Sequence, residues 1–319
     1  MTPHTARLSV VVGVEHTESG HLAVAWAADE AAGRGLPLRL VHALEWPVGA
    51  PEPHHPHTKE PPPRDRPSEH VHATSWPVQV YRDPDLTPPR HGWGDKFRDA
   101  GRRTLDRAHA LALGRHPGLE VVDVLVDGDP VAVLRAEAVE AAMVVVGSRH
   151  LSAATELMTT GGIAVPLAAH AGCPVAVVRR PDHEEELTRT VVVGVDGAAR
   201  SEPAIALAFD EASRRDAVVE AVLVTHATRH ADEQGRVRLA ESLAGWKEKY
   251  PDVVIRPQVA HGHPVRVLAD RSAAALCLVV GSRGLGGFRG MLLGSVGHGL
   301  IHRASCPVIV VPSHDVEEA

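Results

Sequence analysis

A run of glycines near the C-terminal end of the chain has the spacing of a loop that approaches a ligand. The run consists of Gly281, Gly284, Gly286, Gly287 and Gly290. It follows a valine-rich apolar stretch, over residues 276–281, that is typical of a buried parallel strand. Because glycine lacks a Cβ, such a loop can bring its backbone N–H groups close to a bound molecule.

A helix is expected directly after this loop. Gly294 and Ser295 open an apolar segment whose spacing over residues 296–304 fits a helix. The start of a helix presents unpaired N–H groups and the positive end of the helix dipole, and Ser295 adds a hydroxyl at the cap. The order of strand, glycine loop and helix therefore predicts an anion site, with phosphate as the expected ligand.

Two common phosphate motifs do not fit this spacing. No Gly-Lys-Ser/Thr follows the strand, so the loop is not a P-loop, and the three glycines of a dinucleotide fingerprint match poorly. The observed pattern is Gly281, two residues, Gly284, nine residues, then Gly294 and Ser295. A structural turn without a ligand is the alternative, since these glycines would also suit a sharp crossover.

The spacing and its surroundings, GSRG, GGFRG, LLGSV and CPVIVV, resemble the ATP-binding signature of the universal stress protein family. The resemblance implies that ATP is bound by Gly194, Asp196, Gly281, Ser282, Arg283, Gly284, Gly294, Ser295 and Val296. It implies that Asp196 faces the adenine or ribose end and that the loop glycines and Ser295 hold the phosphates. Mg is expected to arrive with the phosphate oxygens, which are ligands that it prefers. We predict no catalytic residue and no metal ligand from the protein.

The chain repeats itself, which indicates two copies of one domain. Five matches occur in the same order: LSVVVGVE with TVVVGVD, LVHA with VTHA, GDPV with GHPV, VVVGSR with LVVGSR, and CPV with CPV. We place the first domain at residues 1–182 and the second at 183–319. The resemblance thus extends over nearly the whole chain, and it implies a tandem universal stress protein.

The periodicity predicts an α/β fold of two tandem doubly wound domains, each an open five-stranded parallel sheet with helices on both faces. Strands are expected at 8–14, 38–44, 119–126, 143–147 and 173–178, then at 191–195, 218–225, 253–259, 276–281 and 306–311. Helices are expected at 19–32, 95–114, 131–142, 202–214, 232–250, 265–274 and 296–304. Because valine-rich edge strands tend to pair with their like, we expect residues 173–178 and 306–311 to join the two copies. The sequence leaves open whether two such chains form a homodimer.

The first copy departs from the signature. His150 stands where Gly284 stands in the second copy, residues 151–160 contain no glycine, and Glu15 replaces Asp196. A Cβ at that position resists the backbone conformation that glycine permits. We therefore expect the first copy to bind nucleotide weakly, through Gly13 and Gly147, or not at all. The alternative is a loop of another shape in which Arg149 and His150 supply positive charge.

An insert rich in proline and histidine, at about residues 46–94, separates the second and third strands of the first copy. Such polar sequence does not bury enough apolar surface to fold alone. Its histidines are His54, His55, His57, His70 and His72. Imidazole binds Zn, Ni and Cu, yet solvated loop histidines are the simpler interpretation. The same choice applies to His298 and His302, one helical turn apart.

Net charge, cysteine count and the motifs that are missing limit the classes of function that the chain can have. The net charge is −7 and basic residues are not gathered into a stripe, which disfavours nucleic acid and anionic membranes as partners. Three cysteines, no N-terminal signal pattern and no apolar run of membrane length favour a cytoplasmic protein. No Walker lysine, catalytic-loop carboxylate or arginine finger is found. We therefore expect an ATP-binding stress-response regulator. A slow ATP hydrolase of the adenine-nucleotide hydrolase type and a scaffold with structural nucleotide are the alternatives.

Overall fold

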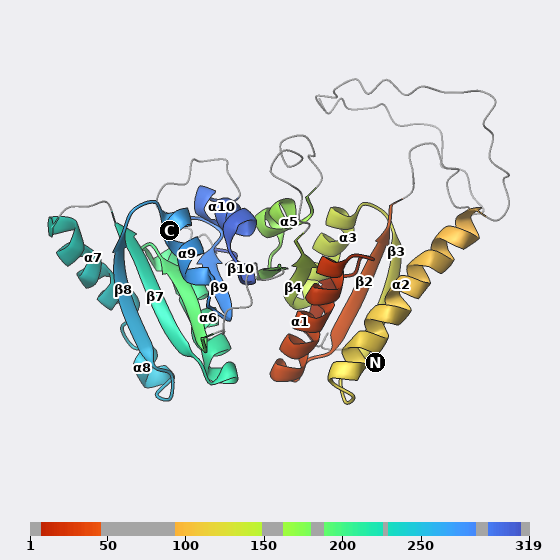
Figure 1. Cartoon of the computed structure of the whole chain (residues 1–319), viewed down its shortest axis with the longest axis horizontal. Helices are drawn as coiled ribbons and strands as arrows, with labels where there is room; N and C mark the ends of the chain where they lie inside the picture. The colour runs from red at the N-terminus through yellow and green to blue at the C-terminus, as the bar shows by residue number, and fades with distance from the viewer. Residues whose placement is uncertain are drawn as a thin grey trace, which may run out of the picture.

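The strands form one ten-stranded sheet with helices on both faces (Figure 1). The computed structural model describes residues 8–45, 93–148, 162–179, 188–225, 229–284 and 293–313. The strands are β1 (Ser9–Gly13), β2 (Leu38–Leu44), β3 (Val121–Asp127), β4 (Ala141–Gly147), β5 (Val175–Val178), β6 (Thr190–Val195), β7 (Val218–Thr225), β8 (Ile255–His261), β9 (Cys277–Gly281) and β10 (Val308–Val311). The helices are α1 (Glu18–Arg34), α2 (Trp93–Arg115), α3 (Pro130–Glu137), α5 (Ala164–His170), α6 (Glu202–Arg215), α7 (Arg229–Ser242), α8 (Trp246–Lys249), α9 (Pro264–Ser272) and α10 (Ser295–Arg303).

Each half of the sheet is parallel, and its strand order repeats. The order across the sheet is β3-β2-β1-β4-β5-β10-β9-β6-β7-β8, so the second half mirrors the first. The strands at the middle of each half are rich in valine because both of their faces are covered; Val10, Val11 and Val12 are all fully buried. The expected fold of two doubly wound five-stranded halves is confirmed.

The two halves meet through their last strands, as predicted. β10 pairs with β5 in the antiparallel direction, with Ile309 opposite Ala176. The other strand pairs within each half are parallel. The strands of the two halves therefore run in opposite directions where the halves meet.

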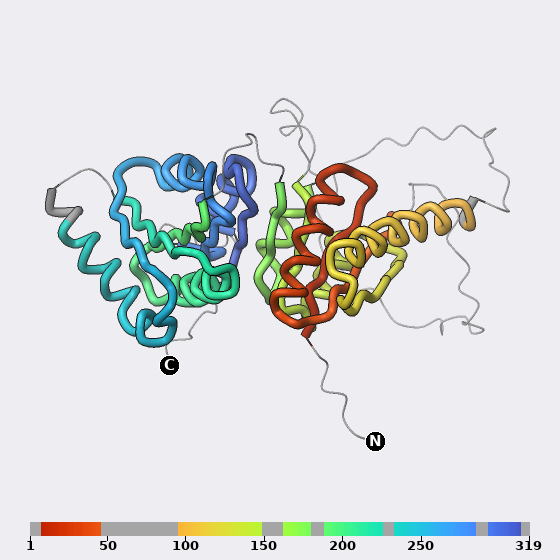
Figure 2. The backbone as a smooth tube through the Cα atoms, turned by 60° about the horizontal axis from the view of Figure 1, so that its bottom comes forward, coloured from red at the N-terminus to blue at the C-terminus, as the bar shows by residue number. Residues whose placement is uncertain are grey.

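Two apolar layers run across both halves. Successive residues of a strand point to opposite faces, so Val10 and Val193 belong to one buried cluster and Val11 and Val192 to the other. Helices α1, α2, α6, α7 and α8 cover the first face, which Figure 2 turns toward the viewer, and α3, α5, α9 and α10 cover the second. The core is therefore continuous through the joint between the halves.

The expected single helix over residues 232–250 is wrong. Helix α7 ends at Ser242, and the chain turns at Gly245 with a φ of 79° before α8 begins. This left-handed conformation suits glycine and ends a helix. The turn lets Trp246 stack on Phe209 of α6, with ring centroids 5.3 Å apart. Helix α8 therefore covers one end of the core.

Other boundaries shift by a few residues. β5 and β10 begin at Val175 and Val308, after Pro174 and Pro307, because proline has no N–H for the sheet. The helix expected over 131–142 ends at Glu137 and is followed by a short 3-10 turn, Ala138–Glu140. The insert lies outside the described residues up to the start of α2, as do its histidines and the expected boundary near residue 182.

A buried ion cluster joins α1 and α6 across the joint. Glu30 and Glu211, both with fully buried side chains, share Arg34, Arg214 and Arg215. Burial by itself raises the pKa of Glu30, but the three arginines and a hydrogen bond from Glu211 outweigh it and hold the pKa at about 2. Burial and the charge of Glu30 raise the pKa of Glu211. The halves are thus joined by charge as well as by apolar packing.

Candidate functional site

Asp196 follows β6 at the carboxyl edge of the second half, where its side chain is held in place. Its Oδ1 accepts hydrogen bonds from the Ala198 N–H at 2.9 Å and from the Ser201 hydroxyl at 2.5 Å. Its Oδ2 lies 3.4 Å from Nε of Arg200. This Oδ2 is buried and accepts no hydrogen bond from the described residues. One carboxylate oxygen is therefore oriented by the protein, and the other keeps its capacity to accept a hydrogen bond.

The glycine loop begins beside this carboxylate. A Cβ placed on Gly284 would lie 3.7 Å from Oδ2 of Asp196. The chain comes back to the same place at Gly294, whose N–H donates to the Ser282 carbonyl at 2.7 Å. The structure thus brings together three segments that are far apart in the sequence, at Asp196, Gly284 and Gly294. Residues 285–292, which include Gly286, Gly287 and Gly290, lie outside the described part of the chain.

The start of α10 lies at the same edge. Gly294 is its N-cap, and no side chain caps the helix. The N–H groups at the first positions of a helix have no intrahelical acceptor, so those of Ser295 and Val296 are available to a ligand. Ser295 is exposed and Val296 is half-buried. This arrangement can bind an anion through backbone donors, a hydroxyl and the helix dipole.

Ser282 positions the loop. Its N–H donates to the Val311 carbonyl at 2.7 Å, and its hydroxyl accepts from the N–H of Ser313 at 3.1 Å. These bonds tie the end of β9 to the end of β10. The backbone N–H, the carbonyl and the hydroxyl of Ser282 all have partners within the protein, so Ser282 holds the loop in place. Its expected contact with nucleotide stays a prediction. Arg283, next to it, is half-buried.

Gly194 and Gly13 have a packing role. A Cβ on Gly194 would lie 3.0 Å from Leu268 of α9 and 3.1 Å from Val280. At the same position of the first copy, a Cβ on Gly13 would lie 3.0 Å from Leu134 of α3. All three distances are tighter than ordinary contact. The close approach of a helix to the sheet accounts for these glycines without a ligand.

The first copy has less space between the end of its fourth strand and the start of its first helix. A Cβ on Gly147 would lie 2.7 Å from the Ser19 carbonyl oxygen, whereas a Cβ on Gly281 would lie 3.9 Å from that of Arg200. Ser19 and Arg200 occupy equivalent positions in the two repeats. The start of α1 therefore packs more closely on β4 than the turn before α6 does on β9, where the atom nearest to a Cβ on Gly281 would be the Arg283 carbonyl oxygen at 3.3 Å. Arg149 and His150 lie outside the described residues.

Ser201 and Arg200 were missed by sequence reasoning. Both contact Asp196 from the short 3-10 turn Ala199–Ser201 that precedes α6. A serine directly before a predicted helix is a known capping signal, and it could have drawn attention to this turn. That Ser201 binds Asp196 instead follows only from the geometry.

His298 and His302 lie on one side of α10, with ring centroids 5.0 Å apart. Burial and the proximity of His302 lower the pKa of His298, which favours its neutral form at neutral pH. Within the described ranges, no group of three or more His, Cys, Asp or Glu side chains could hold a metal ion. Among the residues that the structure describes, the pair therefore has no further protein ligand for a metal ion.

Comparisons with known proteins agree with this architecture. The sequence profile of the universal stress protein family matches twice, at residues 7–179 and 188–312. A universal stress protein of Mycobacterium tuberculosis is 35% identical, covering 94% of this chain and 96% of its own, and a second one from this species is 33% identical over 97% and 98%. A crystal structure of a universal stress protein from Archaeoglobus fulgidus superposes with a TM-score of 0.67 at 17% identity, covering 98% of this chain and 99% of its own. Among the described residues, the structure contains no helix that combines the length and apolar character needed to cross a bilayer.

Proposed function

Because the chain belongs to the universal stress protein family, we propose that its second domain binds ATP with Mg and uses nucleotide occupancy to regulate a stress response in the cytoplasm. The observation that carries the proposal is the convergence of Asp196, Gly284 and the uncapped start of α10 at one edge of the sheet. This is the edge where ligands bind in open α/β sheets.

The residues present fit the nucleotide. The buried Oδ2 of Asp196, without a hydrogen-bond donor among the described residues, can accept one from a ribose hydroxyl or an adenine amino group. The missing side chain at Gly284 leaves room directly in front of that oxygen. The N–H groups at the start of α10 and the Ser295 hydroxyl suit the phosphates.

We propose that Mg is bound mainly by the phosphate oxygens of the nucleotide and not by protein side chains. Mg prefers oxygen ligands and usually keeps several waters when phosphate binds it. The described residues offer no cluster of three metal-binding side chains near the loop. Mg would therefore enter with the phosphates, where it neutralises their charge.

The two domains are proposed to differ. The tight contact between Gly147 and Ser19 leaves less space in the first domain than the second has at Gly281. We therefore expect one ATP per chain, held by the second domain. Such asymmetry suits a regulator in which one domain senses nucleotide and the other transmits the change or contacts a partner.

The first test is the nucleotide content of gently purified protein, released by acid and separated by chromatography. The test variant combines Gly284→Ala with Ser295→Ala. The expected backbone constraint at Gly284 is wrong, because its φ is not in the left-handed region; a Cβ there makes only ordinary contact, so this variant should fold. The matched control is Gly118→Ala, where a Cβ meets no atom within 4 Å. We expect about one ATP per chain in the wild type and the control, and its loss in the test variant.

The other outcomes are equally informative. Two ATP molecules per chain would show that the first domain also binds. No nucleotide, together with no thermal stabilisation by added ATP and Mg, would refute ATP binding. Exchange of bound ATP for labelled ATP within minutes supports a sensor, whereas nucleotide that never exchanges supports a scaffold.

A further inference from the structure

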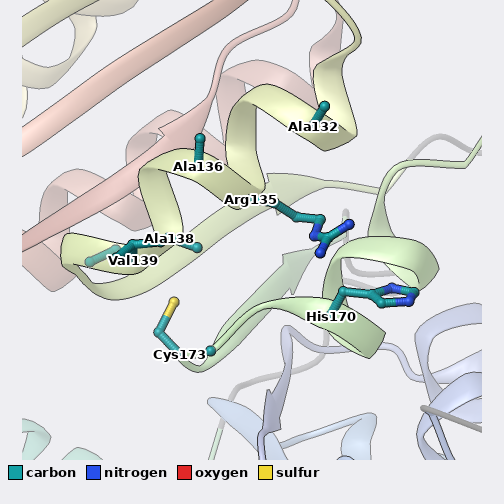
Figure 3. Close-up of a pocket in the computed structure, with 9 residues that line it drawn as sticks. Ala132, Arg135, Ala136, Ala138, Val139, His170 and Cys173 are labelled. Carbon is teal, nitrogen blue, oxygen red and sulfur yellow. The ribbon is translucent and has the colours of Figure 1, made fainter. Parts of the chain in front are cut away.

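We propose that a pocket between α3 and α5 of the first domain binds a small carboxylate that carries an apolar group. The pocket has a volume of about 620 Å³, and its lining residues are Ala132, Arg135, Ala136, Ala138, Val139, Ala141, His170, Gly172 and Cys173 (Figure 3). It lies at the amino ends of β4 and β5, the edge of this half opposite to Gly147. It is therefore separate from the nucleotide position of either domain.

The second domain shows why the pocket is open. There, a Cβ on Gly299 of α10 would lie only 2.8 Å from Val265 of α9, so glycine is what allows these two helices to pack closely. The equivalent residues of the first domain are Pro166 and Val131. A proline ring does not fit in that space, and α5 must stand farther from α3.

A second difference concerns a hydrogen-bonded connection at the end of α9, which the second domain has and the first domain lacks. In the second domain, the buried hydroxyl of Ser272 donates to the Ala269 carbonyl at 2.6 Å and accepts from the Ser305 N–H at 2.8 Å. These bonds connect the end of α9 with the segment before β10. The first domain has Ala138 and Gly172 at the positions of Ser272 and Ser305, so the connection does not form. Both residues line the pocket instead.

The polar side of the pocket suits a carboxylate. Arg135 of α3 and His170 at the end of α5 extend from facing elements into it (Figure 3). His170 donates from Nδ1 to the Pro166 carbonyl at 2.8 Å, which fixes the orientation of its ring. No carboxylate of the described residues forms an ion pair with Arg135. A guanidinium group binds a carboxylate through two parallel hydrogen bonds.

The remaining wall is apolar. It consists of small side chains from α3 and the turn after it, and Val139 is 82% exposed. An apolar group of the ligand would cover this valine and remove its surface from water. A bare phosphate would leave this apolar wall exposed to water. The N–H of Ala132, in the first turn of α3, already donates to Oδ1 of Asp129 at 2.8 Å. The lining therefore favours a carboxylate with an apolar tail.

Binding at this pocket is not covalent. Burial raises the pKa of the Cys173 thiol to about 11, which outweighs the hydrogen bonds that lower it. The thiol is therefore protonated at neutral pH, and a thiol in that state is a poor nucleophile. Cys173 contributes to the wall of the pocket only.

The test is titration calorimetry of the full chain with octanoate, compared with acetate and with octanol. Acetate lacks the apolar tail and octanol lacks the charge, so we expect each to bind at least about tenfold more weakly. Arg135→Gln should reduce octanoate affinity about tenfold or more. The matched control is Arg103→Gln, an exposed arginine of α2 outside the pocket, which should bind as the wild type does.

A second variant fills the space without disturbing the fold. A Cβ at Gly172 meets no atom within 4 Å, so Gly172→Leu should fold and occupy the pocket. We expect it to lose octanoate binding while its thermal unfolding stays close to that of the wild type. Unchanged octanoate affinity in both Arg135→Gln and Gly172→Leu would overturn the proposal. Absence of octanoate binding at millimolar concentration, or tighter binding of inorganic phosphate, would also overturn it.

Discussion

The three arginines of the buried ion cluster should contribute unequally to stability, although two of them occupy equivalent positions in the repeat. Arg34 donates to Oε1 of Glu30 and of Glu211, and Arg214 donates to the same two oxygens. Arg215 donates to Oε2 of both glutamates, at 2.6 and 2.9 Å. Among the described residues, no other arginine bonds these Oε2 atoms. No other arginine can therefore replace the bonds of Arg215, whereas Arg214 already makes the same two contacts as Arg34.

The perturbations are Arg215→Met and Arg34→Met, which keep an unbranched apolar stem and remove the charge. Removing one partner of a buried charge cluster costs about 3–5 kcal/mol when the remaining charge is left unpaired. We expect this cost for Arg215→Met. For Arg34→Met we expect about 1–2 kcal/mol, since each Oε1 keeps its bond from Arg214.

Urea unfolding at pH 7, followed by circular dichroism, gives the free energy of unfolding of each variant. The exposed ion pair of Arg102 with Asp99 offers a matched control, and Arg102→Met should change stability by less than about 1 kcal/mol. An Arg34→Met variant that is as unstable as Arg215→Met, or less stable, would refute the assignment of the two Oε2 atoms to Arg215 alone.

Three further predictions concern packing, the candidate site and pH. Gly299→Ala should destabilise the protein by about 1–3 kcal/mol, because its Cβ would lie 2.8 Å from Val265; the shift of the urea midpoint measures this. Ser201→Ala should weaken ATP binding several-fold with little change in stability, because Asp196 loses one of its two orienting donors; titration calorimetry of nucleotide-free protein tests this. The pKa of Glu30 is lowered to about 2, so its contribution to stability is present above its unfolded value near 4.5 and is lost as pH falls from there toward 2. Unfolding free energies at pH 5 and pH 3 should therefore differ less in Glu30→Gln than in the wild type, and an equal difference would contradict this origin of the acid sensitivity.

Much of the fold could be predicted because its signals are local. Valine-rich runs such as Val191 to Val193 predict buried parallel strands, and the recurrence of the same motifs predicts two copies of one domain. The pairing of β5 with β10 followed from two exposed apolar edges of the same kind. The expected long helix failed at Gly245, because helical periodicity says nothing about which glycine takes a positive φ.

The candidate site was predicted in part. The spacing from Gly281 to Ser295 located the loop and the start of α10, and the structure brings both beside Asp196. Gly194 also has a packing role, since a Cβ there would lie 3.0 Å from Leu268, and its expected contact with nucleotide stays a prediction. The contact of Ser201 with Asp196 depends on the turn before α6, whose shape was not evident from residue types.

The sequence by itself determined the α/β class, the tandem repeat, the pairing of the two last strands and the position of the glycine loop. Only the tertiary structure decided that Arg34 meets Glu211 across the two halves, and that α3 and α5 of the first half enclose an open pocket. The reason is physical. Periodicity and spacing report on neighbours along the chain, whereas these contacts join residues that come together only after the sheet has formed and its helices have packed on it.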